Sequence, residues 1–180
     1  MKIVDWLEKA PIINKNGYKY VVHPITDGIP YIEPSLLEEI VDEIAKKMPK
    51  CDKIVTVEAM GIPIATALSL KTGIPFNIIR KRKYGLEGEV EVKQKTGYSE
   101  SNLYINGIKK DDEIIIVDDV VSTGGTLKAI INAFKKMGVN VKGVFIAIGK
   151  GNRKAIEEEI GIKLYTIIDI MVKENEVKIL

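Results

Sequence analysis

Residues 114 to 126 read Ile-Ile-Ile-Val-Asp-Asp-Val-Val-Ser-Thr-Gly-Gly-Thr. The unbroken apolar run at the start of this stretch is typical of a strand that is buried on both faces. Beyond it, apolar residues recur at helical spacing until a glycine that would end the helix: Leu127, Ile130, Ile131, Phe134, Met137 and Gly138. Asp118 and Asp119 are therefore expected at the carboxyl end of a central strand, and the turn after them opens a helix. In open α/β sheets, ligands bind at this place.

The residue types of this turn match a phosphorylated sugar. Gly124 and Gly125 allow backbone N–H groups to point into a concavity, and the start of a helix adds partial positive charge, which suits a phosphate. Further donors come from three hydroxyl side chains, Ser122, Thr123 and Thr126. The two aspartates repel a phosphate, but they suit sugar hydroxyls or a divalent cation beside it. A phosphate next to vicinal hydroxyls is a ribose 5-phosphate.

Length and composition describe an ordinary globular protein. The chain has 180 residues, of which 46% are hydrophobic and 29% are charged, enough for one domain with its own core. A net charge of +2 gives no overall case for nucleic-acid binding. No stretch approaches the roughly 20 apolar residues of a membrane span, and no secretion signal is recognisable. The single Cys51 excludes an internal disulfide framework and a cysteine-based metal cluster, so we expect a cytoplasmic protein.

Strands and helices are expected to alternate along most of the chain. Apolar runs predict strands at 53–57, 75–79, 114–117, 139–148, 163–172 and 176–179. Between them, helical spacing predicts helices, and this alternation is typical of a parallel sheet covered by helices. Ser35 and Glu38 match a capping box at the start of one such helix. Residues 23–30 are too rich in Pro and Gly to be expected as regular structure.

A long connection separates the strand at 75–79 from the strand at 114–117. It begins with four consecutive basic side chains, Arg80, Lys81, Arg82 and Lys83. Val90 and Val92 alternate with charged residues, which suggests one strand of a small hairpin. A connection of this length inside a compact domain is usually a lid or a binding loop, and a tolerated insertion is the alternative.

Several motifs resemble one enzyme family. Residues 117–126 resemble the phosphoribosyl pyrophosphate (PRPP) signature of the type I phosphoribosyltransferases. Glu-Ala-Met-Gly at 58–61 resembles the Glu-Ala-Arg-Gly turn of the adenine-type members, with Met60 in the place of the arginine. Pro-Phe-Asn-Ile-Ile-Arg-Lys at 75–81 resembles their Pro-Phe-x-x-x-Arg-Lys. With His-Pro-Ile-Thr-Asp-Gly-Ile-Pro at 23–30, the whole chain is most similar to the archaeal hypoxanthine/guanine phosphoribosyltransferases, which are built on the adenine-type scaffold.

This resemblance implies a fold and a reaction. The fold would be the α/β type I phosphoribosyltransferase fold, with a central, mostly parallel sheet flanked by helices. Residues 1–180 would form one domain, with a small hood from 1–34 and a mobile lid loop at 80–102. The reaction would be purine salvage, moving 5-phosphoribosyl from PRPP to hypoxanthine or guanine to give IMP or GMP and pyrophosphate. An adenine or xanthine phosphoribosyltransferase is the alternative, followed by a transcriptional regulator that senses PRPP or purines.

The resemblance also implies the site. Asp118, Asp119, Arg80 and Lys81 would be catalytic, since cations stabilise leaving pyrophosphate and carboxylates stabilise an oxocarbenium-like ribose. PRPP would be bound by the two aspartates and by Val120, Val121, Ser122, Thr123, Gly124, Gly125, Thr126, Glu58, Ala59, Met60 and Gly61. Ile25 and Thr26 in the hood would meet the purine. Mg²⁺ would be the cofactor, carried by PRPP near the two aspartates without a direct protein ligand, and the protein would be a homodimer.

Three roles stay open. Some hypoxanthine/guanine members have an aspartate just before the Thr-Gly pair, where it manages a purine proton, whereas this chain has Ser122. Another group, such as Glu100 on the lid, takes over that role, or none is required. Thr-Gly-Tyr-Ser at 96–99 either closes over the ribose or is a plain turn. The only histidine, His23, either contacts the base or has a hydrogen-bonded structural role.

Overall fold

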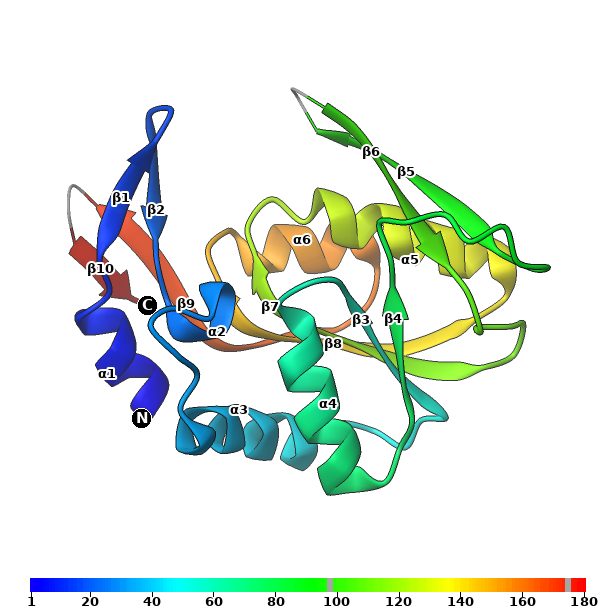
Figure 1. Ribbon diagram of the computed structural model, residues 1–180, viewed down its shortest axis with the longest axis horizontal. Coiled ribbons are helices and arrows are strands. Elements are labelled where there is room, and N and C mark those ends of the chain that lie inside the picture. Colours follow the sequence, from blue (N-terminus) through cyan, green and yellow to red (C-terminus); the bar gives the residue numbers. More distant parts are fainter. Residues whose placement is uncertain (97–98, 174–175) are drawn as a thin grey trace.

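A six-stranded sheet forms the centre of the molecule, with strand order β10-β9-β8-β7-β3-β4 (Figure 1). The computed structural model describes residues 1–96, 99–173 and 176–180, without the side chains of residues 95–100. The strands are β3 (Lys53–Val57), β4 (Phe76–Ile79), β7 (Glu113–Val121), β8 (Asn140–Gly149), β9 (Leu164–Lys173) and β10 (Glu176–Ile179). All neighbours pair in parallel except β9 and β10, so the predicted mostly parallel sheet is confirmed.

Helices cover both faces of this sheet, as its apolar strands require. On one face lie α3 (Pro34–Lys47) and α4 (Gly61–Thr72), and on the other lie α5 (Gly125–Met137) and α6 (Arg153–Ile160). Successive strand residues point to opposite faces, so Ile115 joins the core under α4 and Ile116 joins the core under α5. No helix in the described part of the chain is long and apolar enough to cross a membrane.

The first residues of the chain form a small unit beside the carboxyl ends of the strands. It consists of α1 (Lys2–Glu8), β1 (Ile12–Lys15), β2 (Tyr18–Val21) and α2 (Pro24–Asp27). β1 and β2 pair as an antiparallel hairpin. The expectation of irregular structure at 23–30 was wrong in part. His23 caps α2, since its Nδ1 accepts a hydrogen bond from the Ile25 N–H at 3.1 Å, and proline fits the first helical turn.

The capping box predicted at Ser35 and Glu38 was also wrong. α3 begins at Pro34, so Glu33 is its N-cap residue, and no side chain among the described residues caps the helix. Pro34 takes the first helical position, where its missing N–H costs nothing, and this moves Ser35 inside the helix.

The connection at 80–102 contains more regular structure than a loop. Residues 81–88 are exposed, and then β5 (Val90–Thr96) and β6 (Ser99–Ile105) pair as an antiparallel hairpin. Val92 and Leu103 are buried in the core that α5 shares, and Figure 1 shows the hairpin extending beyond the sheet on that side. The hairpin inferred from Val90 and Val92 is confirmed, while motion of this lid stays a prediction.

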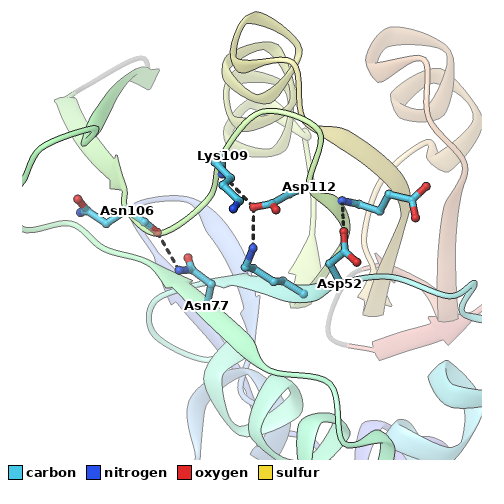
Figure 2. A network of polar contacts seen from close by, with 7 residues as sticks. Asp52, Asn77, Asn106, Lys109 and Asp112 are labelled. Atoms are coloured by element: carbon cyan, nitrogen blue, oxygen red, sulfur yellow. Dashed lines mark hydrogen bonds and ion pairs between the residues drawn. The ribbon is translucent and has the colours of Figure 1, made fainter.

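A network of polar contacts fastens the return from β6 to β7 at the amino ends of the strands (Figure 2). The buried Asp112 carboxylate accepts hydrogen bonds from Lys53 Nζ at 2.7 Å and from the Lys109 N–H at 2.9 Å. Asn77 on β4 donates to the Asn106 carbonyl at 2.8 Å. The base of the lid is therefore tied to the sheet at the end opposite the acidic turn.

Candidate active site

The two adjacent aspartates lie inside β7 and not beyond its end. β7 continues to Val121, four residues further than the strand predicted at 114–117. Because side chains alternate along a strand, the two carboxylates point towards different faces of the sheet. Asp118 lines a cavity against α5, whereas Asp119 interacts electrostatically with Asp27 and with Lys150.

The turn after β7 surrounds a cavity of about 220 Å³. Its lining includes every residue predicted for the donor loop apart from Asp119: Asp118, Val120, Val121, Ser122, Thr123, Gly124, Gly125 and Thr126. Gly124 has φ +78°, and a Cβ there would lie 2.8 Å from Ile156 Cγ2, so only glycine fits. Within the described residues no side chain caps α5, which leaves the N–H groups of its first turn for an anion.

Burial raises the pKa of both aspartates. The pKa of Asp118 is raised well above its usual value, first by burial and then by the neighbouring charge of Asp119. Burial also raises the pKa of Asp119. Neighbouring carboxylates disfavour being ionised together, so a cation or a developing positive charge near them would be stabilised.

The turn after β3 packs directly against Asp118. A Cβ added to Gly61 would overlap the Thr56 hydroxyl and lie 2.7 Å from Asp118 Oδ1. Ala59 is exposed, and Met60 packs near Gly28 of the N-terminal unit. The two turns predicted to hold the donor are thus adjacent in space, at the carboxyl ends of neighbouring parallel strands.

Glu58 connects this turn to the basic segment. Its Oε1 accepts hydrogen bonds from Arg80 Nε at 3.1 Å and from the Lys81 N–H at 2.5 Å, and these bonds lower the pKa of Glu58. Arg80 is also held through backbone hydrogen bonds with Tyr104 of β6. Arg80 and Lys81 therefore start the lid beside the Glu58 turn, and the Glu58 carboxylate is occupied by them.

The two predicted hood residues do not face an open site. Ile25 is completely buried in the core under α3 and α4. The Thr26 hydroxyl donates to Asp27 Oδ2 at 2.6 Å. Asp27 also accepts the Tyr20 hydroxyl at 2.6 Å, and these bonds outweigh burial and lower the pKa of Asp27. Asp27 is the residue of this unit that interacts electrostatically with both Asp119 and Lys150.

Lys150 is a site residue that the sequence analysis missed. It follows β8 directly, and its N–H donates to the Val121 carbonyl at 2.8 Å. Its ammonium is 5.0 Å from the centroid of the Tyr20 ring, and burial lowers the pKa of Lys150. Its position in the sequence could have indicated this residue. Gly-Lys-Gly at 149–151 follows a central strand of a parallel sheet, and ligands bind at the carboxyl ends of such strands.

His23 has a structural role, and its burial predicts a pH dependence of stability. The side chain is 1% exposed, and burial lowers its pKa from 6.5 to about 4. Below pH 6.5, His23 is protonated in the unfolded chain, whereas in the folded protein it stays neutral down to about pH 4. The folded protein therefore has its full stability with respect to His23 above pH 6.5, and this part of the stability is lost as pH falls towards 4. We expect the free energy of unfolding to fall by about 2–3 kcal/mol across this window from His23 alone.

Urea unfolding at pH 7 and pH 4.5 would measure this effect against a His23→Asn variant. Asparagine keeps an acceptor for the N–H of Ile25 but does not titrate in this range. The Asp118 and Asp119 carboxyls titrate with the opposite sign in both proteins, so the difference between the two proteins isolates His23. Equal pH dependence in both proteins would refute the assignment.

Two predicted lid contacts lie outside the described residues. Residues 97 and 98 of the Thr-Gly-Tyr-Ser segment are not described, nor are the side chains of its other members and of Glu100. Closure of this segment over a ribose, and proton transfer by Glu100, therefore stay predictions.

Comparison with known proteins identifies the family of this chain. A model of the phosphoribosyl transferase domain matches residues 34–178. The chain belongs to the phosphoribosyltransferase family. The resemblance inferred from the sequence motifs is thereby confirmed, and so is the expectation of an enzyme of this class.

Relatives and solved structures agree with this assignment. Hypoxanthine/guanine phosphoribosyltransferase of Methanothermus fervidus is 56% identical over 99% of this chain and 96% of its own length. The protein of the same name from Methanocaldococcus infernus is 53% identical over 99% and 100%. Adenine phosphoribosyltransferase of Thermoanaerobacter pseudethanolicus has a TM-score of 0.77 at 20% identity, covering 93% of this chain and 98% of that one. This likeness confirms the type I phosphoribosyltransferase fold.

Proposed function

We propose that this protein transfers the 5-phosphoribosyl group of PRPP to hypoxanthine and guanine, giving IMP or GMP and pyrophosphate. The observation that carries the proposal is similarity at 56% identity, over 99% of this chain and 96% of the relative, to a protein of that name, and a cavity lined by the turn after β7 supports it. Adenine phosphoribosyltransferases share the fold at 20% identity, which does not decide the base.

The donor would be held by backbone N–H groups and carboxylates. The first turn of α5 and the hydroxyls of the loop would bind the 5-phosphate in the cavity beside Asp118. The two aspartates would hold the ribose hydroxyls and place negative charge near the anomeric carbon as it becomes oxocarbenium-like. Arg80 and Lys81, fastened to Glu58, would face pyrophosphate as it leaves. The contacts to the 5-phosphate would thus supply binding energy away from the anomeric carbon, where the reaction takes place.

Magnesium fits this site only as part of the donor. Within the described residues no group of three or more His, Cys, Asp or Glu side chains is arranged to hold a metal ion. Asp118 and Asp119 are hard oxygen ligands, and Mg²⁺ commonly combines one or two carboxylates with waters and substrate phosphates. When bound with PRPP, the ion would neutralise charge on pyrophosphate.

Lys150 would select the base. An ammonium only donates hydrogen bonds, so it matches the carbonyl oxygen at position 6 of hypoxanthine and guanine. Adenine has an amino group there, which also donates. The Lys150 ammonium lies 5.0 Å from the centroid of the Tyr20 ring and interacts electrostatically with Asp27 and Asp119. The carbonyl oxygen of a 6-oxopurine would be a further partner of the Lys150 ammonium.

A base panel tests the proposal. We expect turnover of hypoxanthine and guanine with PRPP and magnesium, and kcat/KM for adenine lower by at least about 100-fold. Lys150→Met keeps the length of the side chain without its charge, and it should lower kcat/KM for hypoxanthine by about 10–150-fold, the value of a hydrogen bond to a charged group. The measurement is pyrophosphate release at fixed, saturating PRPP.

Lys154→Met is the matched control, because Lys154 is exposed on α6. It should leave kcat/KM unchanged for every base. Preference for adenine in the wild type would overturn the assigned substrate, and full activity of Lys150→Met on hypoxanthine would overturn the role of the lysine.

Further features are proposed from the family resemblance alone. We propose that residues 1–180 act as one domain, with 1–34 as the hood and 80–102 as a mobile lid. We also propose a cytoplasmic homodimer whose partners are PRPP and the purine base, with neither nucleic acid nor membrane involved.

A further inference from the structure

Thr56 combines complete burial with an unpaired hydroxyl. It lies in β3, is 0% exposed, and among the described residues its Oγ1 has no hydrogen-bond partner. The other buried polar residues in the described part of the chain are His23, Thr26 and Asp112, and each makes at least one hydrogen bond, although His23 Nε2 also has no partner there. Leaving a buried hydroxyl unpaired is unfavourable, and valine would fill the same volume in a strand whose other buried residues are Ile54, Val55 and Val57.

The hydroxyl lies beside the acidic site. A Cβ on Gly61 would overlap Thr56 Oγ1 and would also lie 2.7 Å from Asp118 Oδ1, so the two oxygens approach the same backbone atom. Asp118 Oδ1 already accepts the N–H of Asp119 at 2.9 Å, which fixes that oxygen from the other side. A carboxylate oxygen has room for a second donor, and a threonine hydroxyl rotates to provide one.

We propose that Thr56 is a positioning residue for Asp118. When the ribosyl donor is bound and Asp118 is ionised, the Thr56 hydroxyl donates to its carboxylate and holds it towards the ribose. Thr56 itself would not touch the donor, because its side chain is completely buried. The inference rests on the proposed function, since it assigns a supporting contact within the same site.

The test uses the opposed effects of Thr56→Val on stability and activity. Removing an unpaired buried hydroxyl should raise the Tm of the free protein by about 2–4 °C. The same change should lower kcat/KM for PRPP by about 10-fold, mostly by raising KM, since the contact forms when the donor binds. Thr56→Ser keeps the hydroxyl and should retain activity within about threefold. If Thr56 were purely structural, Thr56→Val would not raise Tm and lower kcat/KM at the same time.

Thr66→Val is the control, because the Thr66 hydroxyl donates to the Ile62 carbonyl within its own helix, α4. Wild-type activity of Thr56→Val would overturn the proposal, and so would an equal loss in Thr56→Ser, which would assign the effect to the methyl group. If Thr56→Val does not fold, Thr56→Ala is compared with Thr56→Ser in the same way.

Failure of the proposed function would be seen separately. If the wild type turns over no purine base, that function is wrong, and the Thr56 proposal is then decided by calorimetric binding of PRPP with magnesium. Weaker binding in Thr56→Val than in Thr56→Ser supports it, and equal binding overturns it.

Discussion

Replacing Asp119 with asparagine is expected to lower kcat/KM for PRPP by at least about 100-fold. Asparagine keeps the shape but loses the charge that would face the ribose. A hydrogen bond to a charged group contributes about 1.5–3 kcal/mol, or roughly 10–150-fold, and the lost countercharge to an oxocarbenium-like ribose adds to this. Pyrophosphate release with hypoxanthine measures the effect, and Asp118→Asn should behave in the same way.

Folding should survive these changes. Burial raises the pKa of both carboxyls, so the folded protein disfavours their charges, and a neutral amide should leave Tm equal or higher. Asp111→Asn is the matched control, since Asp111 is exposed with φ +69°, a backbone conformation that asparagine adopts as readily. Asp119→Asn with kcat/KM within twofold of the wild type would show that the acidic pair does not serve the reaction.

Gly61→Ala is expected to damage both stability and activity. The added Cβ would overlap the Thr56 hydroxyl, lie 2.7 Å from Asp118 Oδ1 and lie 3.3 Å from the Val117 carbonyl oxygen. Overpacking of this kind typically costs about 1–3 kcal/mol. Displacing the Asp118 carboxylate from its working position should lower kcat/KM by about 100-fold. Thermal melting and steady-state kinetics on the same preparation measure the two effects.

A double variant separates the causes of that damage. Thr56→Ala with Gly61→Ala removes the overlap with the hydroxyl, so Tm should recover, while the close contact with Asp118 keeps activity low. Leu70→Ala on the same helix is the control, because Leu70 is 84% exposed and should change neither quantity. Normal stability and activity in the single variant Gly61→Ala would contradict the packing described around Asp118.

Much of the donor site could be predicted from the sequence because its parts are neighbours along the chain. An apolar strand, an acidic pair, a glycine turn and a helix occupy residues 113–137 without interruption. Periodicity and turn chemistry act over a few residues, so this pattern is visible in one stretch. The hairpin at 90–105 was foreseen for the same reason, from alternating valines.

What the tertiary structure decided depends on side chains far apart in sequence. Ile25 belongs to a hood motif, but packing under α3 and α4 places it in the core. Lys150 meets Tyr20 only because β8 ends beside the N-terminal hairpin. The placement of Asp118 and Asp119 on different sides follows from how far β7 extends, which its pairing with β8 sets.

The sequence by itself thus determined the alternating α/β framework, the family, and the turn that would hold a ribose phosphate. These are properties of local pattern, since hydrophobic period and turn residues act through nearest neighbours. Only the folded structure decided that Thr56, Gly61 and Asp118 share one packed contact, and that the Lys150 ammonium lies beside the Tyr20 ring. Such contacts arise where strands from different parts of the chain align in one sheet, which no local pattern records.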